Sequence, residues 1–211
     1  KIKKLTLGNY KSSFAIIDHQ FLKDEQRITF RFNKNEYSFS TKLIGRVQIK
    51  NLLMAIMAAI NSKISLEKIL KITKKIKPVN GRLEKIGRLN NNGIVILDYA
   101  HTPDALETCI KDIKEQFKLR KINLVFGCGG DRDKPKRKIM GKIANEYCDK
   151  IFLTDDNPRN ENPKKIRDEI KKNISKFKLF EISSRETAIH KAIQNLNSGE
   201  ILLVAGKGHE S

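Results

Sequence analysis

From residue 94 onward, short apolar runs alternate with longer segments whose apolar residues recur at the helical period. The apolar runs cover residues 94–98, 122–126, 151–153, 179–182 and 201–205. Short buried strands separated by helices are typical of a parallel sheet whose crossover connections cover its two faces. This part of the chain therefore predicts an α/β fold with a doubly wound, mainly parallel sheet.

Polar motifs follow four of the predicted strands, at the point where each strand ends. They cover residues 98–101, 127–133, 155–159 and 206–210. In open α/β sheets, ligands bind in the crevice at the carboxyl ends of the strands. We therefore expect these loops to share one binding site.

The loop from Thr154 to Pro163 joins the strand at 151–153 to a predicted helix at 164–174. Pro158 fixes its own backbone and favours an extended Asn157. Carboxylates at 155 and 156 with a guanidinium at Arg159 suit a zwitterionic ligand, because acids accept from an ammonium and arginine forks onto a carboxylate. The alternative for this loop alone is an ordinary surface turn.

Glycines at 127, 129 and 130 let the backbone bend tightly and bring N–H groups near an anion, although a sharp turn alone also explains them. The spacing matches neither a Walker A loop nor Gly-x-Gly-x-x-Gly. The residues alone thus indicate a small-molecule-binding domain without naming its reaction.

The first part of the chain has a different pattern. Residues 1–44 alternate in short runs, with a predicted turn at 33–36 between antiparallel strands, and helices are expected at 51–60 and 65–75. The Pro78–Gly81 stretch breaks this pattern. We expect one domain over residues 1–79 and a second over 80–211.

The net charge of +19 comes from 43 Lys and Arg against 24 Asp and Glu, spread along every segment of the 211 residues. Without a basic block or interleaved aromatic residues, this favours no nucleic-acid partner. Three cysteines without a Cys-x-x-Cys pair predict reduced thiols and a cytoplasmic protein, and no run is long enough to span a membrane. Both ends of the sequence are those expected of a piece of a longer protein.

Five motifs, taken together and in order, resemble the Mur ligases, in particular the branch that adds diaminopimelate. The motifs are Gly-Arg-Leu-Glu at 81–84, Asp-Tyr-Ala-His-Thr-Pro-Asp-Ala-Leu at 98–106, Gly-Cys-Gly-Gly-Asp-Arg-Asp-Lys at 127–134, Thr-Asp-Asp-Asn-Pro-Arg at 154–159 and Gly-Lys-Gly-His-Glu at 206–210. The resemblance implies that residues 1–79 end a central ATP-binding domain. Residues 80–211 then form most of a Rossmann-like, amino-acid-binding C-terminal domain.

The resemblance also implies a reaction in peptidoglycan precursor synthesis. ATP phosphorylates the D-glutamate carboxylate of UDP-N-acetylmuramoyl-L-alanyl-D-glutamate, and the amine of meso-diaminopimelate attacks the acyl phosphate. Mg²⁺ and cations neutralise the phosphates, with the Mg²⁺ ligands outside this chain. A monomer without nucleic-acid or membrane partners is expected.

Site residues follow from the motif positions. The resemblance implies that the diaminopimelate pocket contains Arg132, Asp156, Asn157, Pro158, Arg159, Gly206 and Glu210. It implies that the residues near the nucleotide are Asn51, Arg82, Asp98 and His101. No catalytic residue and no metal ligand is expected within this chain.

The sequence also departs from the family pattern. Val47-Gln48 stands where relatives often have Phe-Asn, which affects the expected adenine contact, and Lys138 stands where relatives often have Pro. The Walker A loop and the carbamylated lysine of the central domain are not in these 211 residues, so the isolated chain is predicted to be inactive. Alternatives are a ligase for lysine, a folylpolyglutamate synthase and a non-catalytic basic binding module.

Overall fold

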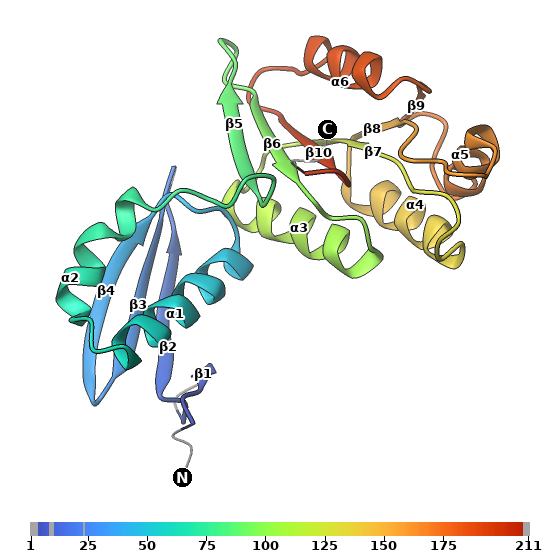
Figure 1. The fold of residues 1–211 in the computed structure, drawn as a ribbon. Coiled ribbons are helices and arrows are strands. Elements are labelled where there is room, and N and C mark those ends of the chain that lie inside the picture. The colour runs from blue at the N-terminus through green and yellow to red at the C-terminus, as the bar shows by residue number, and fades with distance from the viewer. Residues whose placement is uncertain (1–3, 9–10, 23, 209–211) are drawn as a thin grey trace. The chain divides into compact units, whose positions relative to one another are not determined.

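The computed structural model describes residues 4–8, 11–22 and 24–208 (Figure 1). The chain divides into two compact units, Lys1–Pro78 and Val79–Ser211. Each unit has its own sheet and its own apolar core.

The first unit is built on a four-stranded sheet. Its strands, in order across the sheet, are β1 (Leu7–Gly8), β2 (Phe14–Phe21), β3 (Gln26–Phe32) and β4 (Asn35–Thr41). β1 and β2 are parallel, and the other pairs are antiparallel. The turn between β3 and β4 is shorter than predicted, because Asn33 and Lys34 both adopt positive φ, 48° and 68°, and close a two-residue hairpin.

Two helices and a 3-10 turn complete this unit: α1 (Arg46–Asn61), α2 (Leu66–Ile72) and η1 (Thr73–Lys75). α1 begins before the predicted start at Asn51, and its N-cap, Gly45, makes no side-chain capping bond that would mark the boundary. The apolar face of α1 packs with residues of the sheet and of α2 in one core, including Phe30, Leu53 and Ile69.

The second unit contains a six-stranded sheet. Its strands, in order across the sheet, are β5 (Glu84–Arg88), β6 (Ile94–Asp98), β10 (Ile201–Ala205), β7 (Ile122–Phe126), β8 (Lys150–Leu153) and β9 (Leu179–Glu181). All neighbouring pairs from β6 to β9 are parallel, so the predicted α/β fold with a mainly parallel sheet is confirmed. β7 and β10 are buried along their whole length, as expected of central parallel strands.

β5 is a strand that the sequence pattern did not predict. It pairs antiparallel with β6 at one edge of the sheet, with a register shift between Lys85 and Gly87. Charged residues and bulges are common on edge strands, where only one side of the backbone is paired. These features hide the period-2 pattern by which a strand is predicted.

The helices of this unit are α3 (Pro103–Gln116), α4 (Pro135–Tyr147), α5 (Pro163–Lys171) and α6 (Arg185–Gln194). Thr102, Asn162 and Ser184 cap α3, α5 and α6 through side-chain oxygens. Pro103 and Pro163 are the first residues of α3 and α5, where the missing N–H of proline needs no partner. α3 and α4 lie on one side of the sheet and α6 on the other, which is the doubly wound arrangement (Figure 1).

The order of the strands in the sheet determines where a ligand-binding crevice can form. Strands β6, β7, β8 and β9 follow one another in sequence, and α6 then returns the chain so that β10 lies between β6 and β7. The loops that leave β6, β7, β8 and β10 consequently meet at the same edge of the sheet.

Candidate functional site

A cavity of about 580 Å³ lies at the carboxyl ends of the parallel strands. It is lined by Tyr99, His101, Thr102, Pro103, Gly129, Arg132, Asp133, Lys136, Asp156, Asn157, Arg159 and Gly206. These residues come from all four loops in which the sequence places polar motifs. The expected convergence of the loops is therefore seen in the fold.

Arg159 lies where the loop after β8 meets the glycine loop after β7. Its guanidinium Nη1 donates to the carbonyl oxygen of Gly130 at 2.6 Å, and its backbone N–H donates to Asn157 Oδ1 at 3.2 Å. The backbone of Arg159 has a φ of 49°, which is uncommon for a residue with a side chain. The loop thus holds this side chain at the cavity in a conformation that the neighbouring bonds enforce.

The two acids of this loop have different surroundings. Asp156 lines the cavity, and its Oδ1 accepts from the backbone N–H of Asn157 at 2.7 Å. Asp155 instead forms an ion pair with Arg167 of α5. Of the two carboxylates expected to accept from a ligand ammonium, only Asp156 lines the cavity.

Three cationic side chains line the same cavity: Arg159, Arg132 and Lys136. Arg132 is exposed, and within the described ranges no hydrogen bond or ion pair holds its guanidinium. Lys136, in the first turn of α4, is only 9% exposed and donates from Nζ to the carbonyl oxygen of His101 at 3.0 Å. Sequence reasoning missed Lys136, because one more lysine carries no signal in a chain of 43 basic residues.

The residues expected near the nucleotide do not all lie at this cavity. His101 lines it, and its Nδ1 lies 2.9 Å from the carbonyl oxygen of Tyr99. Arg82 stacks over the Tyr99 ring, with its Cζ 4.7 Å from the ring centroid. Asp98 is buried and accepts from the backbone N–H groups of Leu83 and Ala100, at 2.7 and 2.8 Å, and burial raises the pKa of its carboxyl.

Of the remaining predicted site residues, Gly206 lines the cavity, and Asn51 and Pro158 do not. Asn51 is exposed on α1, in the first unit. Pro158 is not among the lining residues, but its carbonyl oxygen would lie 1.9 Å from a Cβ on Gly130. Gly206 has a φ of 112° and lines the cavity beside Asp156. Glu210 lies outside the described residues.

The three cysteines are all buried in the second unit, and each is a free thiol, as the sequence predicts. Burial raises the pKa of the Cys128 and Cys148 thiols to about 12. Protected thiols of this kind are inert while the unit is folded.

The second unit also matches a known protein family. Residues 81–208, more than half of the 211, match the Mur ligase, glutamate ligase domain. The chain belongs to the Mur ligase family. The mainly parallel sheet is that of the C-terminal domain of Mur ligases.

Individual Mur ligases show the extent of the likeness. UDP-N-acetylmuramoyl-L-alanyl-D-glutamate–2,6-diaminopimelate ligase of Rickettsia felis is 46% identical over all of this chain, which spans 39% of that protein. A solved structure of a ligase with the same name is 31% identical, with a TM-score of 0.69 over 98% of this chain and 42% of its own. The fold is shared with UDP-N-acetylmuramate–alanine ligase of Thermotoga maritima at 22% identity and a TM-score of 0.77. The chain thus spans about two fifths of the first two of these relatives.

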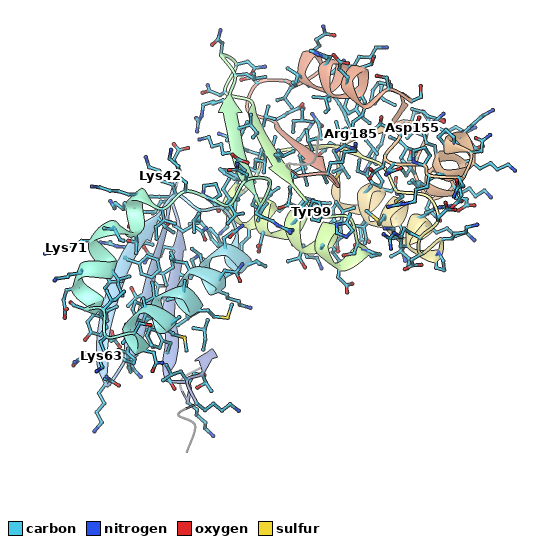
Figure 2. All side chains as sticks on the ribbon, in the orientation of Figure 1. Lys42, Lys63, Lys71, Tyr99, Asp155 and Arg185 are labelled. Atoms are coloured by element: carbon cyan, nitrogen blue, oxygen red, sulfur yellow. The ribbon has the colours of Figure 1, made fainter. Side chains whose placement is uncertain are left out.

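In the first unit, Lys42, Lys63 and Lys71 are exposed and point outward from three different segments (Figure 2). Within the part of the chain that the structure describes, no helix is long and apolar enough to cross a membrane.

Acid stability is expected to depend on Glu161. Its hydrogen bonds from Arg137 lower its pKa to about 2, from an ordinary value of 4.5. A carboxyl whose pKa is depressed by folding stabilises the folded state above its unfolded pKa and loses this effect as the pH falls toward the folded value. The melting temperature of Glu161→Gln should therefore lie below that of the wild type at pH 6, and the difference should shrink between about pH 4.5 and pH 2. Circular dichroism melts across this range would show it, and a pH-independent difference would contradict it.

Proposed function

We propose that this chain is the amino-acid-binding part of an ATP-dependent ligase that joins meso-diaminopimelate to UDP-N-acetylmuramoyl-L-alanyl-D-glutamate. The observation that carries the proposal is one cavity lined by Arg132, Arg159 and Asp156, in a chain of the Mur ligase family. Relatives with 42–47% identity over the whole chain bear the name of this diaminopimelate ligase. Residues 80–211 would then bind the amino acid, and residues 1–79 would end the ATP-binding domain.

Charge decides how the cavity would select its amino acid. Diaminopimelate carries a carboxylate beside its distal ammonium, whereas lysine carries only the ammonium. Arg159 and Arg132 would bind that distal carboxylate, and Asp156 would accept from the ammonium. A pocket built for a carboxylate leaves its arginines unpaired when lysine binds, which favours rejection of lysine. Asn157, Gly206, Pro158 and Glu210 complete the proposed pocket.

The reaction needs a good leaving group on a poor electrophile. Phosphorylation of the D-glutamate carboxylate by ATP supplies an acyl phosphate, and the amine of the bound amino acid then displaces inorganic phosphate. Within this chain, the described residues are proposed to contribute cations at the cavity. The proposal places the catalytic groups and the Mg²⁺ ligands outside the chain.

The residues proposed to lie near the nucleotide are Asn51, Arg82, Asp98 and His101. Asp98 fits an indirect role better, since its carboxylate already accepts two backbone N–H bonds and fixes the start of the loop that carries His101. A monomeric cytoplasmic enzyme is proposed for the whole protein.

The deciding experiment uses the full-length protein that contains this chain. ADP release would be measured with ATP, Mg²⁺ and UDP-N-acetylmuramoyl-L-alanyl-D-glutamate, with meso-diaminopimelate or L-lysine in parallel. We expect turnover with diaminopimelate only. Turnover with lysine alone would overturn the amino-acid assignment but keep the ligase, and absence of turnover with either by a folded protein would overturn the function. The isolated 211-residue chain should release no ADP.

A further inference from the structure

Arg137 is a fully buried cation near the cavity that does not line it. It lies in the first turn of α4, directly after Lys136, and its side chain has an exposed fraction of 0%. Its guanidinium pairs with both oxygens of Glu161, at 2.8 and 3.0 Å, and with Glu169 of α5 at 2.9 Å. A buried arginine with two carboxylate partners is rare enough to require a reason.

Glu161 lies in the same loop as Arg159 and is the hub of the contacts around Arg137. While bound to the guanidinium, its Oε1 also accepts from the backbone N–H of Asp131 at 2.6 Å. One carboxylate therefore joins three pieces of backbone: the start of α4, the glycine loop after β7 and the loop after β8. Arg137 Nη2 also lies 3.4 Å from the carbonyl oxygen of Gly129.

Besides the contacts of Glu161, further hydrogen bonds join the glycine loop after β7 to the loop after β8. Gly130 N–H donates to the carbonyl oxygen of Asn157 at 2.9 Å, and Asn160 donates from its backbone N–H and its Nδ2 to Asp131 Oδ2, at 3.1 and 3.0 Å. The Arg159 side chain donates a hydrogen bond to the carbonyl oxygen of Gly130, so it belongs to the same set of bonds. The position of the Arg159 guanidinium is thus coupled to the spacing of the two loops.

A purely stabilising role does not explain this design. Burying an ion pair contributes little net stability compared with well-packed apolar residues of the same volume. What a planar guanidinium fork does supply is a fixed geometry for two carboxylates at once. The fork is used here to fix a loop that carries a ligand-binding side chain.

We infer that Arg137, acting through Glu161, is a positioning residue that sets Arg159 for the distal carboxylate of the amino acid. This inference rests on the proposed function. Arg137 does not line the cavity and acts only through Glu161, so its loss should weaken binding of the amino acid and spare binding of ATP. Glu169 binds the same guanidinium from α5, outside the loop, and should matter much less.

The chain offers a matched pair for the test, because the same Glu→Gln change can be made on either partner of Arg137. In the full-length ligase, Glu161→Gln should raise the KM for diaminopimelate about tenfold, since it removes a charge-assisted pair from the loop. Glu169→Gln should change this KM by less than about threefold, and both variants should keep the KM for ATP within about threefold. Arg137→Lys keeps the charge without the fork, and should raise the KM for diaminopimelate more than Glu169→Gln does.

Equal effects of Glu161→Gln and Glu169→Gln on the KM for diaminopimelate would overturn the inference, as would equal effects on diaminopimelate and ATP. A second readout does not depend on activity. Limited trypsin digestion, followed by mass spectrometry, reports cleavage after Arg159, and Glu161→Gln should speed it while Glu169→Gln should not. If the wild-type enzyme lacked ligase activity, the proposed function would fail and this digestion would still decide whether Arg137 fixes the loop.

Discussion

Arg159→Ala in the full-length ligase is expected to lower kcat/KM for diaminopimelate by roughly 100-fold, since truncating one partner of a charge pair costs about 2–5 kcal/mol. The guanidinium of Arg159 is proposed to bind the distal carboxylate together with that of Arg132, and its Nη1 donates to the carbonyl oxygen of Gly130. Alanine keeps the Cβ, so the positive φ of 49° at this position imposes the same backbone constraint in both proteins. The change therefore reports on the side chain.

The measurement compares steady-state kinetics with diaminopimelate and with L-lysine. Preference for diaminopimelate should fall, because the variant keeps only Arg132 as the proposed partner of the distal carboxylate, while the KM for ATP stays within about threefold. Arg120→Ala is a suitable control, because Arg120 follows α3 and its Nη1 donates to the carbonyl oxygen of Asn92, not to a residue that lines the cavity. A variant that kept full selectivity would show that another residue reads the carboxylate.

Gly130→Ala should destabilise the second unit by roughly 3 kcal/mol, the upper range for overpacking a tight contact. A Cβ there would lie 1.9 Å from the carbonyl oxygen of Pro158, which is backbone and cannot rotate away. The two loops would have to separate, and the bonds from Gly130 to Asn157 and from Arg159 to Gly130 would be lost. Affinity for diaminopimelate should fall together with stability.

Gly87→Ala is the matched control for this substitution. It introduces the same methyl group into the same unit, on the edge strand β5, where a Cβ would meet nothing within 4 Å. Stability can be followed through the urea dependence of cysteine alkylation, because Cys109, Cys128 and Cys148 are all buried in the second unit. If both variants became reactive at the same urea concentration as the wild type, the close packing of the two loops would be refuted.

Much of the second unit could be predicted from sequence, because its signals are local. Buried parallel strands such as β7 read as continuous apolar runs, and helix starts such as Thr102-Pro103 carry their own capping chemistry. β5 and the start of α1 escaped prediction because an edge strand tolerates charge and Gly45 offers no capping side chain. In both places, tertiary packing replaces the local signal.

The candidate site divides in the same way. The sequence determined which loops form the candidate site, since parallel strands bring their carboxyl ends to one edge of the sheet. Motifs such as Asp-Asn-Pro-Arg also show which charged and polar residues these loops contain. Only the tertiary structure decided which side chains reach the cavity: Asp156 lines it while Asp155 pairs with Arg167, and Lys136 lines it without any distinguishing pattern. The Arg137–Glu161 pair was equally invisible, because its partners are 24 residues apart in a chain rich in charged residues. Such contacts depend on how two loops pack, and no local propensity records that.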